Sequence, residues 1–142
     1  MLGFSGFLAI LALVVMGGMG AYALVNPRWA ARFMRLKDDP ERPGGFAEFR
    51  ATYGGLFFGT HAAALLLVAL YLRGGSDVIG LSAGGAVFAL GAGYAGSAFG
   101  RAVSMLRDKT RTKFNIGSTF FELGAALCLW APWIAGMANG MR

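Results

Sequence analysis

Four long stretches without a basic residue constrain this chain more than any other feature. Their only charged side chain is Glu122, and they cover residues 4–25, 52–72, 78–100 and 115–136. A helix of about 20 apolar residues crosses the roughly 30 Å hydrocarbon core of a bilayer, because it rises about 1.5 Å per residue. Hydrophobic residues make up 56% of the chain and charged ones only 14%. We therefore expect one all-α domain over residues 1–142, an integral membrane four-helix bundle with loops at 26–51 and 101–114.

Two other interpretations of the apolar stretches are weaker. A cleaved signal peptide needs basic residues before its apolar core, and no charged residue precedes Arg28. Transmembrane β-strands need short segments of alternating polarity, whereas these stretches are long and continuously apolar. Helices are therefore the expected spanning elements.

The basic residues predict how the helices are oriented. All but two of the 13 Lys and Arg residues fall in the loops 26–51 and 101–114, and the exceptions are Arg73 and Arg142. Short loops rich in Lys and Arg stay in the cytoplasm, and nearby acids such as Asp38 and Asp39 weaken this rule little. We expect a multi-pass protein of the bacterial inner membrane, with both loops cytoplasmic and both termini outside.

The net charge of +6 also bears on partners. Topology already explains the basicity, and no nucleic-acid-binding motif is present, so we expect no nucleic-acid partner. Anionic lipid headgroups attract cations near the membrane surface by about 1 kcal/mol each. We predict headgroup contacts for six loop cations: Arg28, Arg32, Arg35, Lys109, Arg111 and Lys113.

The first loop is predicted to hold a short amphipathic helix. Asn26 and Pro27 are typical of a helix start, since proline at the first position gives up no hydrogen bond. Trp29, Phe33 and Leu36 then share one face, and Arg28, Arg32 and Arg35 another, as in a helix lying in the headgroup region. We expect it to end before Pro40 and Pro43. A solvated charged loop is the alternative.

Glycine spacing predicts close helix packing. The chain has 23 glycines, and rows of small residues spaced by four let helix backbones approach in lipid. Stretch 78–100 has two such rows, so it is either central in the bundle or faces a second chain. The rows are Gly80, Gly84, Ala92, Gly96 and Gly100, beside Gly85, Ala89, Gly93 and Ser97, with a further row of Gly55, Gly59 and Ala63 in stretch 52–72.

A weak internal repeat pairs Phe57 and Phe58 with Phe120 and Phe121, so that Gly54 corresponds to Gly117. A duplication would produce two repeated helical hairpins of parallel orientation. Chance matches between apolar segments are the alternative.

Ionisable groups inside the spans are candidates for function, because they are costly in lipid. Glu122 lies about 12 Å and His61 about 15 Å beyond the inner boundary, at about 1.5 Å per residue. We expect Glu122 to accept a hydrogen bond or ion pair from Arg101 or Arg50, with Tyr94 at similar depth. An internal clamp, the lining of a ligand cavity and contact with a partner subunit all fit this pattern.

His61 and Cys128 each occur alone. Bis-histidine haem, an intrachain disulfide and a thiolate zinc site all need more ligands than that, so we expect packing roles for both. No nucleophile–base set or phosphate loop is present. We predict no catalytic residue, no metal and no cofactor beyond a bound lipid or quinone, and hence no enzyme.

Several short elements carry a family resemblance. They are Glu48-Phe49-Arg50-Ala51 followed by Tyr53-Gly54-Gly55, then Gly100-Arg101-x-x-Ser104-x-x-x-Asp108, then Glu122. The chain resembles small bacterial four-helix membrane proteins catalogued only as a domain of unknown function. More distantly it is similar to DoxX-type proteins and the four-helix scaffold of ergosterol biosynthesis. The resemblance implies the fold and marks Arg50, Arg101, Ser104, Asp108 and Glu122. The family usually has glycine where this chain has Lys109.

Two classes of function are consistent with these features. The first is a non-catalytic accessory or scaffold subunit that packs against a larger membrane complex or its own copies, and we favour it. The alternative is a small carrier or binder of lipid, quinone or sterol, with a cavity around Glu122 and His61.

Overall fold

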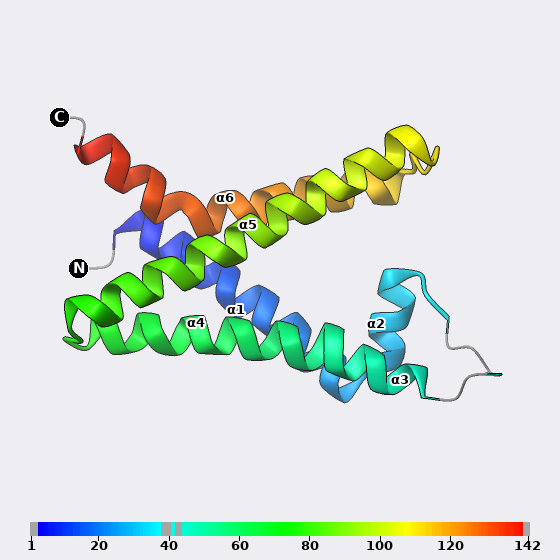
Figure 1. The fold of residues 1–142 in the computed structure, drawn as a ribbon, viewed down its shortest axis with the longest axis horizontal. Helices are drawn as coiled ribbons and strands as arrows, with labels where there is room; N and C mark the ends of the chain where they lie inside the picture. The colour runs from blue at the N-terminus through cyan, green and yellow to red at the C-terminus, as the bar shows by residue number, and fades with distance from the viewer. Residues whose placement is uncertain (1–2, 38–40, 42–43, 141–142) are drawn as a thin grey trace. The chain divides into compact units, whose positions relative to one another are not determined.

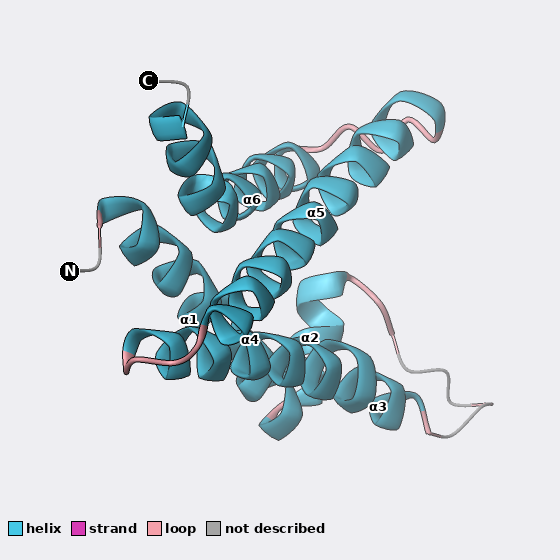
Figure 2. Ribbon diagram, turned by 60° about the vertical axis from the view of Figure 1, so that its left-hand side comes forward, coloured by secondary structure: helices cyan, strands magenta, loops and turns pink. Residues whose placement is uncertain are grey.

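The computed structural model describes residues 3–37, 41 and 44–140, and every regular element in them is helical (Figures 1 and 2). This confirms the all-α prediction. The elements are α1 (Phe4–Val25), α2 (Pro27–Met34), α3 (Gly45–Glu48), the π-helix η1 (Phe49–Leu56), α4 (Phe57–Leu72), α5 (Asp77–Arg107) and α6 (Lys113–Gly140). Asp38, Asp39, Pro40, Arg42, Pro43 and Arg142 lie outside the described residues.

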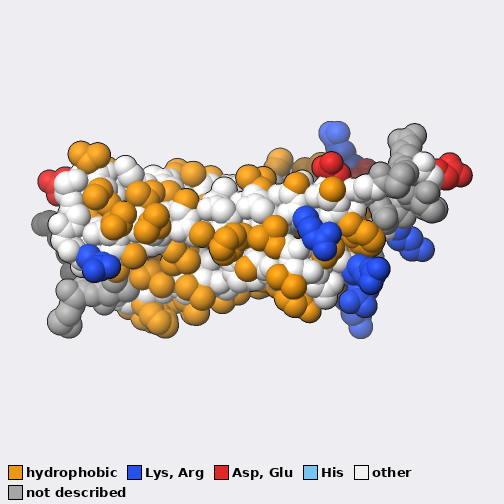
Figure 3. All heavy atoms as spheres, turned by 90° about the horizontal axis from the view of Figure 1, so that it is seen from below, with side chains coloured by type: hydrophobic (Ala, Val, Ile, Leu, Met, Phe, Trp, Pro, Cys, Tyr) orange, Lys and Arg blue, Asp and Glu red, His pale blue; other side chains and the backbone are white. Residues whose placement is uncertain are grey.

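Among the described residues, four helical stretches are long and apolar enough to cross a membrane, as predicted: Phe4–Val25, Gly45–Leu72, Asp77–Arg107 and Lys113–Asn139. Their surfaces carry large exposed hydrophobic side chains, such as Leu81 at 77% and Leu106 at 83% exposure. On the face drawn in Figure 3, many hydrophobic side chains reach the surface. A water-soluble fold would bury most of these side chains, so the surface is compatible with a membrane helical bundle.

The helix ends differ from the sequence-based expectation at two places. The second span starts at Gly45 rather than near residue 52, because α3, η1 and α4 follow one another without a break. Helix α5 continues to Arg107, so Arg101 lies inside a helix and not in a loop. The expectation that this helix ends at Gly100 was wrong, because it assumed that a membrane helix stops at the first charged residue. Arg101 can lie within the helix because it forms an ion pair with Glu122.

The chain forms two compact units. The first unit contains Met1–Ala12 and Leu67–Arg142, and the second contains Leu13–Leu66. Each is described by itself below.

In the second unit, α1 packs very closely on η1 and α4. A methyl group placed on Gly20 would lie 2.5 Å from the backbone nitrogen of Phe58, and one on Gly54 would lie 2.9 Å from the backbone nitrogen of Leu24. Further along, a methyl group on Gly17 would lie 3.1 Å from Cβ of His61. Residue numbers rise on one helix as they fall on the other, so the two run antiparallel with glycine at each contact.

These glycines are not the ones that the sequence pattern indicated for this span. A methyl group added to Gly59 would have no atom within 4 Å, and one added to Gly55 would meet only the Arg50 carbonyl at 3.5 Å. The predicted row of Gly55, Gly59 and Ala63 therefore makes no close packing contact at its two glycines. The π-helix takes more residues per turn than an α-helix, so it rotates Gly54 rather than its neighbours toward α1.

Helix α2 confirms the prediction of a short helix in the first loop. The side chain of Asn26 accepts a hydrogen bond from the backbone N–H of Trp29, and Pro27 is the first helical residue. Arg35 ends the helix in the left-handed conformation, with φ of 59°. Its small side chains Ala30 and Ala31 are buried in a cluster with Ala23 and Phe49.

In the first unit, α5 and α6 lie side by side (Figures 1 and 2). The indole N–H groups of Trp130 and Trp133 donate to the backbone carbonyls of Phe88 and Gly84, at 3.1 and 3.2 Å. A methyl group on Gly91 would lie 2.6 Å from Nε1 of Trp130. One side of α5 is therefore filled by α6 aromatic rings.

Residues paired by the internal repeat have different surroundings. Gly54 is buried against Leu24, while its counterpart Gly117 is exposed and has nothing within 4 Å of a methyl position. The duplication stays a prediction.

Candidate functional site

Two stripes of polar side chains occur on α5 and α6, the paired helices of the first unit. On α5, Tyr94, Ser97, Arg101 and Ser104 recur every three or four residues, so they share one face of the helix. On α6, Asn115, Thr119 and Glu122 follow the same spacing. Polar stripes in otherwise apolar helices are expected where the helices meet, since lipid offers no hydrogen bonds.

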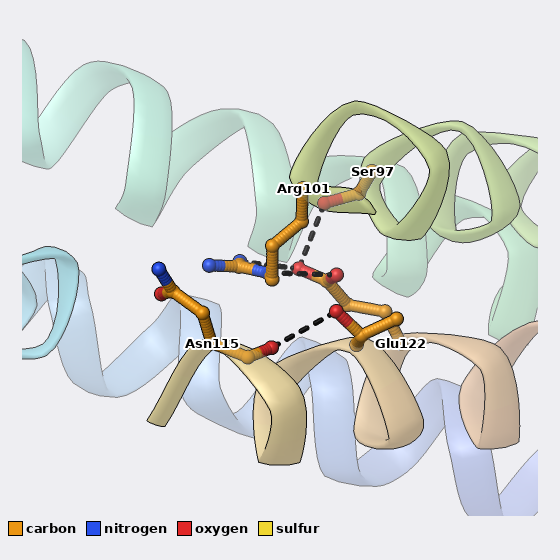
Figure 4. Close-up of polar contacts among 5 residues, drawn as sticks. Ser97, Arg101, Asn115 and Glu122 are labelled. Carbon is orange, nitrogen blue, oxygen red and sulfur yellow. Dashed lines mark hydrogen bonds and ion pairs between the residues drawn. The ribbon is translucent and has the colours of Figure 1, made fainter. Parts of the chain in front are cut away.

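The centre of the site is an ion pair between Arg101 and Glu122 (Figure 4). Nη2 of Arg101 donates to Oε1 of Glu122 at 2.6 Å, and Nε donates to Oε2 at 3.1 Å. The Ser97 hydroxyl donates to Oε1 at 2.8 Å. The guanidinium and carboxylate are thus joined by two parallel hydrogen bonds, which is the strongest geometry for this pair.

Burial makes this arrangement important for stability. Glu122 is 9% exposed, and the Arg101 side chain is 28% exposed. A carboxylate that leaves water without a counter-charge is strongly unfavourable, so the three hydrogen bonds and the adjacent cation offset the cost of burying Glu122. Tyr94, also buried at 9% exposure, lies close enough to interact electrostatically with Glu122.

A second set of hydrogen bonds closes the site toward the linker between α5 and α6. Ser104 and Thr110 share a hydrogen bond of 3.0 Å between their hydroxyls, and Nδ2 of Asn115 donates to the Thr110 carbonyl at 2.6 Å. The Thr112 hydroxyl accepts from the backbone N–H of Asn115 at 3.2 Å, which caps the first turn of α6. Thr119 donates to the Asn115 carbonyl at 2.9 Å, the dashed line nearest Asn115 in Figure 4. The linker is therefore tied to both helices.

Arg50, the other candidate partner of Glu122, has a different role. It lies in the second unit, where its Nε donates to the backbone carbonyl of Leu24 at 3.1 Å. The last carbonyls of a helix lack intrahelical partners, so this bond caps the C-terminal end of α1. Of the two predicted partners, Arg101 binds Glu122 within the described structure.

His61 is buried in the second unit. It is 2% exposed, its ring stacks on Phe57 with centroids 5.9 Å apart, and its Cβ faces Gly17. The Nδ1–H donates to the Phe57 carbonyl at 2.6 Å, since a carbonyl can only accept. Among the residues that the structure describes, no group of three metal-ligand side chains occurs. Cys128 is half-buried with a free thiol.

The remaining predicted residues lie at helix ends. Asp108 follows α5, and its backbone N–H donates to the Ser104 carbonyl at 2.8 Å. Lys109 then takes a left-handed conformation with φ of 56°, which glycine adopts more readily than other residues. The six predicted headgroup contacts are all exposed: Arg28, Arg32, Arg35, Lys109, Arg111 and Lys113.

Four members of the site were not predicted from the sequence: Thr110, Thr112, Asn115 and Thr119. Each has an ordinary polar side chain near a predicted helix start, where polar residues are common. The signal that could have found two of them is the spacing of residues 115, 119 and 122, which places three polar groups on one face of an apolar helix.

The described residues form an all-helical structure with four span-length apolar helices and a buried ion pair between the last two. The chain belongs to the family described as domain of unknown function DUF4345, whose model matches residues 4–132. No curated protein and no solved structure matches it. The matched range includes both polar stripes, so the site belongs to the family domain.

Proposed function

We propose that this protein is a non-catalytic membrane scaffold or accessory subunit, which uses one face of α5 to pack against a transmembrane helix of another chain. The observation that carries the proposal is the contrast between two sides of α5. The α6-facing side is filled by Trp130 and Trp133. The other side presents small exposed residues between positions 85 and 100, called here the open face: Gly85, Ala89, Ala92, Gly93, Gly96 and Gly100.

The open face suits helix association because its residues form two parallel rows with a spacing of four. No atom comes within 4 Å of a methyl position on Gly85, Gly93, Gly96 or Gly100. Flat glycine surfaces facing lipid gain little dispersion energy, whereas a second helix against them gains close backbone contact. We therefore expect a helix of another chain, rather than lipid, against the open face.

The polar site supports a structural role in the same scaffold. Both carboxylate oxygens of Glu122 already accept hydrogen bonds from Arg101 or Ser97. A carboxylate engaged in this way serves to hold α5 and α6 together rather than to transfer protons. The ion pair between Arg101 and Glu122, called here the clamp, thereby fixes the rotation of α5 against α6 and so the side on which the open face lies.

For location, we propose the bacterial inner membrane with both termini outside and the two basic loops in the cytoplasm. The support is the bias of Lys and Arg toward these loops. We also propose that this chain has the layout of four membrane spans of DoxX-type proteins. The support is the pattern of four long apolar stretches.

The experiment compares leucine substitutions on two helices. The protein is purified in a mild detergent, and its complex is measured by light scattering and mass spectrometry. We expect the wild-type protein to purify as a homo-oligomer or with a stoichiometric membrane-protein partner. The double variant Gly93→Leu with Gly96→Leu should purify as a monomer without that partner. Gly117→Leu with Gly124→Leu on α6 is the matched control, because these glycines are also exposed, and the complex should persist in this variant.

Two results would contradict the proposal. One is a wild-type monomer without a protein partner, in which case a retained lipid, quinone or sterol would favour the small-molecule binder. The other is equal loss of the complex in both leucine variants, because the open face would then have no special part in it.

A further inference from the structure

Helix α2 presents three different faces. Pro27, Ala30 and Ala31 are buried against the second unit. Arg28 and Arg32 are four residues apart, lie on a second face and are exposed. Trp29 and Phe33 occupy the third, next to the arginines, with Phe33 at 37% exposure. Leu36, which the sequence pattern placed on this face, lies beyond the end of α2 at Met34.

The buried face fixes the rotation of α2. Ala30 and Ala31 are 1% and 6% exposed and share a cluster with Ala23 of α1 and Phe49 of η1. The N-terminal turn is held by the Asn26 side chain. Because the helix cannot turn about its axis without breaking these contacts, the cationic and aromatic faces are presented in a fixed orientation.

The aromatic face continues onto the end of α1. Trp29 packs edge-on against Tyr22 with ring centroids 5.1 Å apart and stacks on Phe33 at 5.4 Å. Tyr22 is 50% exposed, and its hydroxyl accepts a hydrogen bond from Asn26. Amphipathic rings gathered at the end of a span-length helix are typical of the level at which lipid headgroups begin.

The charges of the cationic face are not neutralised by neighbouring carboxylates. Within the part of the chain that the structure describes, neither Arg28 nor Arg32 takes part in an ion pair. The Arg28 guanidinium lies over the Phe46 ring, 5.8 Å from its centroid. A cation–π contact orients the guanidinium and leaves its N–H edge available for an anion.

We infer that α2 is a docking helix for anionic phospholipids. Arg28 and Arg32 bind headgroup phosphates, and Trp29 and Phe33 lie at the boundary between the headgroups and the acyl chains. Phosphate fits because guanidinium groups bind its oxygens through paired hydrogen bonds. A membrane surface fits because the cationic and aromatic faces are adjacent along one short helix, as in interfacial helices. The inference is independent of the packing partner proposed for α5.

The test measures lipid retained by the full chain in a neutral detergent. Native mass spectrometry counts bound phosphatidylglycerol and, at equal added concentration, zwitterionic phosphatidylcholine. Wild type should prefer phosphatidylglycerol. Arg28→Gln with Arg32→Gln should weaken this binding by about fivefold for each arginine removed, while Arg28→Lys with Arg32→Lys should retain most of it.

Arg73→Gln with Arg107→Gln is the matched control, because it removes two exposed cations that are not among the predicted headgroup contacts. Phosphatidylglycerol binding should change much less in this variant, and all three variants should melt within a few degrees of wild type. Equal loss in both glutamine variants would reduce the effect to total charge and overturn the inference. Absence of any headgroup preference, or loss of a bound protein instead of lipid, would also overturn it.

Discussion

Single residues set the stability of the polar site, and Glu122 is the clearest case. It is nearly buried in an apolar helix, yet three hydrogen bonds and one cation satisfy it. Replacing Glu122 with glutamine removes the counter-charge of Arg101 while keeping the shape of the side chain. The free energy of unfolding should fall by about 2–3 kcal/mol, somewhat less than for a fully buried pair, because Arg101 is partly exposed.

Thermal melting in detergent measures the effect of Glu122→Gln. Glu48→Gln is the control, because Glu48 is exposed, and it should melt like wild type. In the double variant Arg101→Gln with Glu122→Gln, the loss should be smaller than the sum of the two single losses. If Glu122→Gln melts with wild type, the clamp has no energetic role.

Lys109 illustrates a residue held in an unfavourable backbone conformation. Its φ of 56° lies in the left-handed region that glycine adopts freely. Lys109→Gly should therefore raise the free energy of unfolding by about 0.5–1 kcal/mol. Lys109→Ala removes the same charge without relieving the backbone and should give no gain, so equal melting temperatures for the two variants would contradict the explanation.

At the scale of helices, glycine placement decides which elements come together. In α1, Gly20 meets the backbone of Phe58, whereas Gly18 has nothing within 4 Å of a methyl position. Gly20→Ala should lower the free energy of unfolding by about 1–3 kcal/mol through overpacking. Gly18→Ala should be neutral or slightly stabilising, since alanine favours helix more than glycine.

The two alanine variants are compared by thermal melting in the same detergent. They add the same methyl group to one helix two residues apart, so helix propensity and membrane insertion are matched. Similar melting temperatures would mean that α1 does not pack on α4 through Gly20.

The π-helix η1 is the element that propensity could not predict. Eight consecutive residues, Phe49–Leu56, adopt it, and its effect is to bring Gly54 onto Leu24. Sequence periodicity assumes 3.6 residues per turn, so it assigns Gly55 and Gly59 to the packing face instead. A local change in the number of residues per turn therefore rotates every residue that follows it to a different side of the helix.

At the scale of the whole molecule, the testable property is orientation in the membrane. In a background of Cys128→Ala, Ser76→Cys places a thiol between α4 and α5, and Asp108→Cys places one between α5 and α6. Both positions are exposed, and neither change alters a Lys or Arg residue. In intact cells a membrane-impermeant maleimide should label Ser76→Cys, and it should label Asp108→Cys only after permeabilisation. The reverse pattern would invert the predicted topology.

The sequence by itself determined the number of long apolar helices, their approximate limits and the short amphipathic helix after Asn26. These properties depend on local sums of hydrophobicity and on capping residues, which a linear pattern contains in full. It also restricted the partner of Glu122 to two arginines.

Only the tertiary structure decided between Arg101 and Arg50, and between Gly54 and Gly55 as the residue that packs on α1. It also extended α5 past Gly100 and added Thr110, Thr112, Asn115 and Thr119 to the polar site. The physical reason is that these choices depend on how each helix is rotated and registered against its neighbour. Rotation and register follow from the packing of all contacting side chains together, and no single stretch of sequence contains that information.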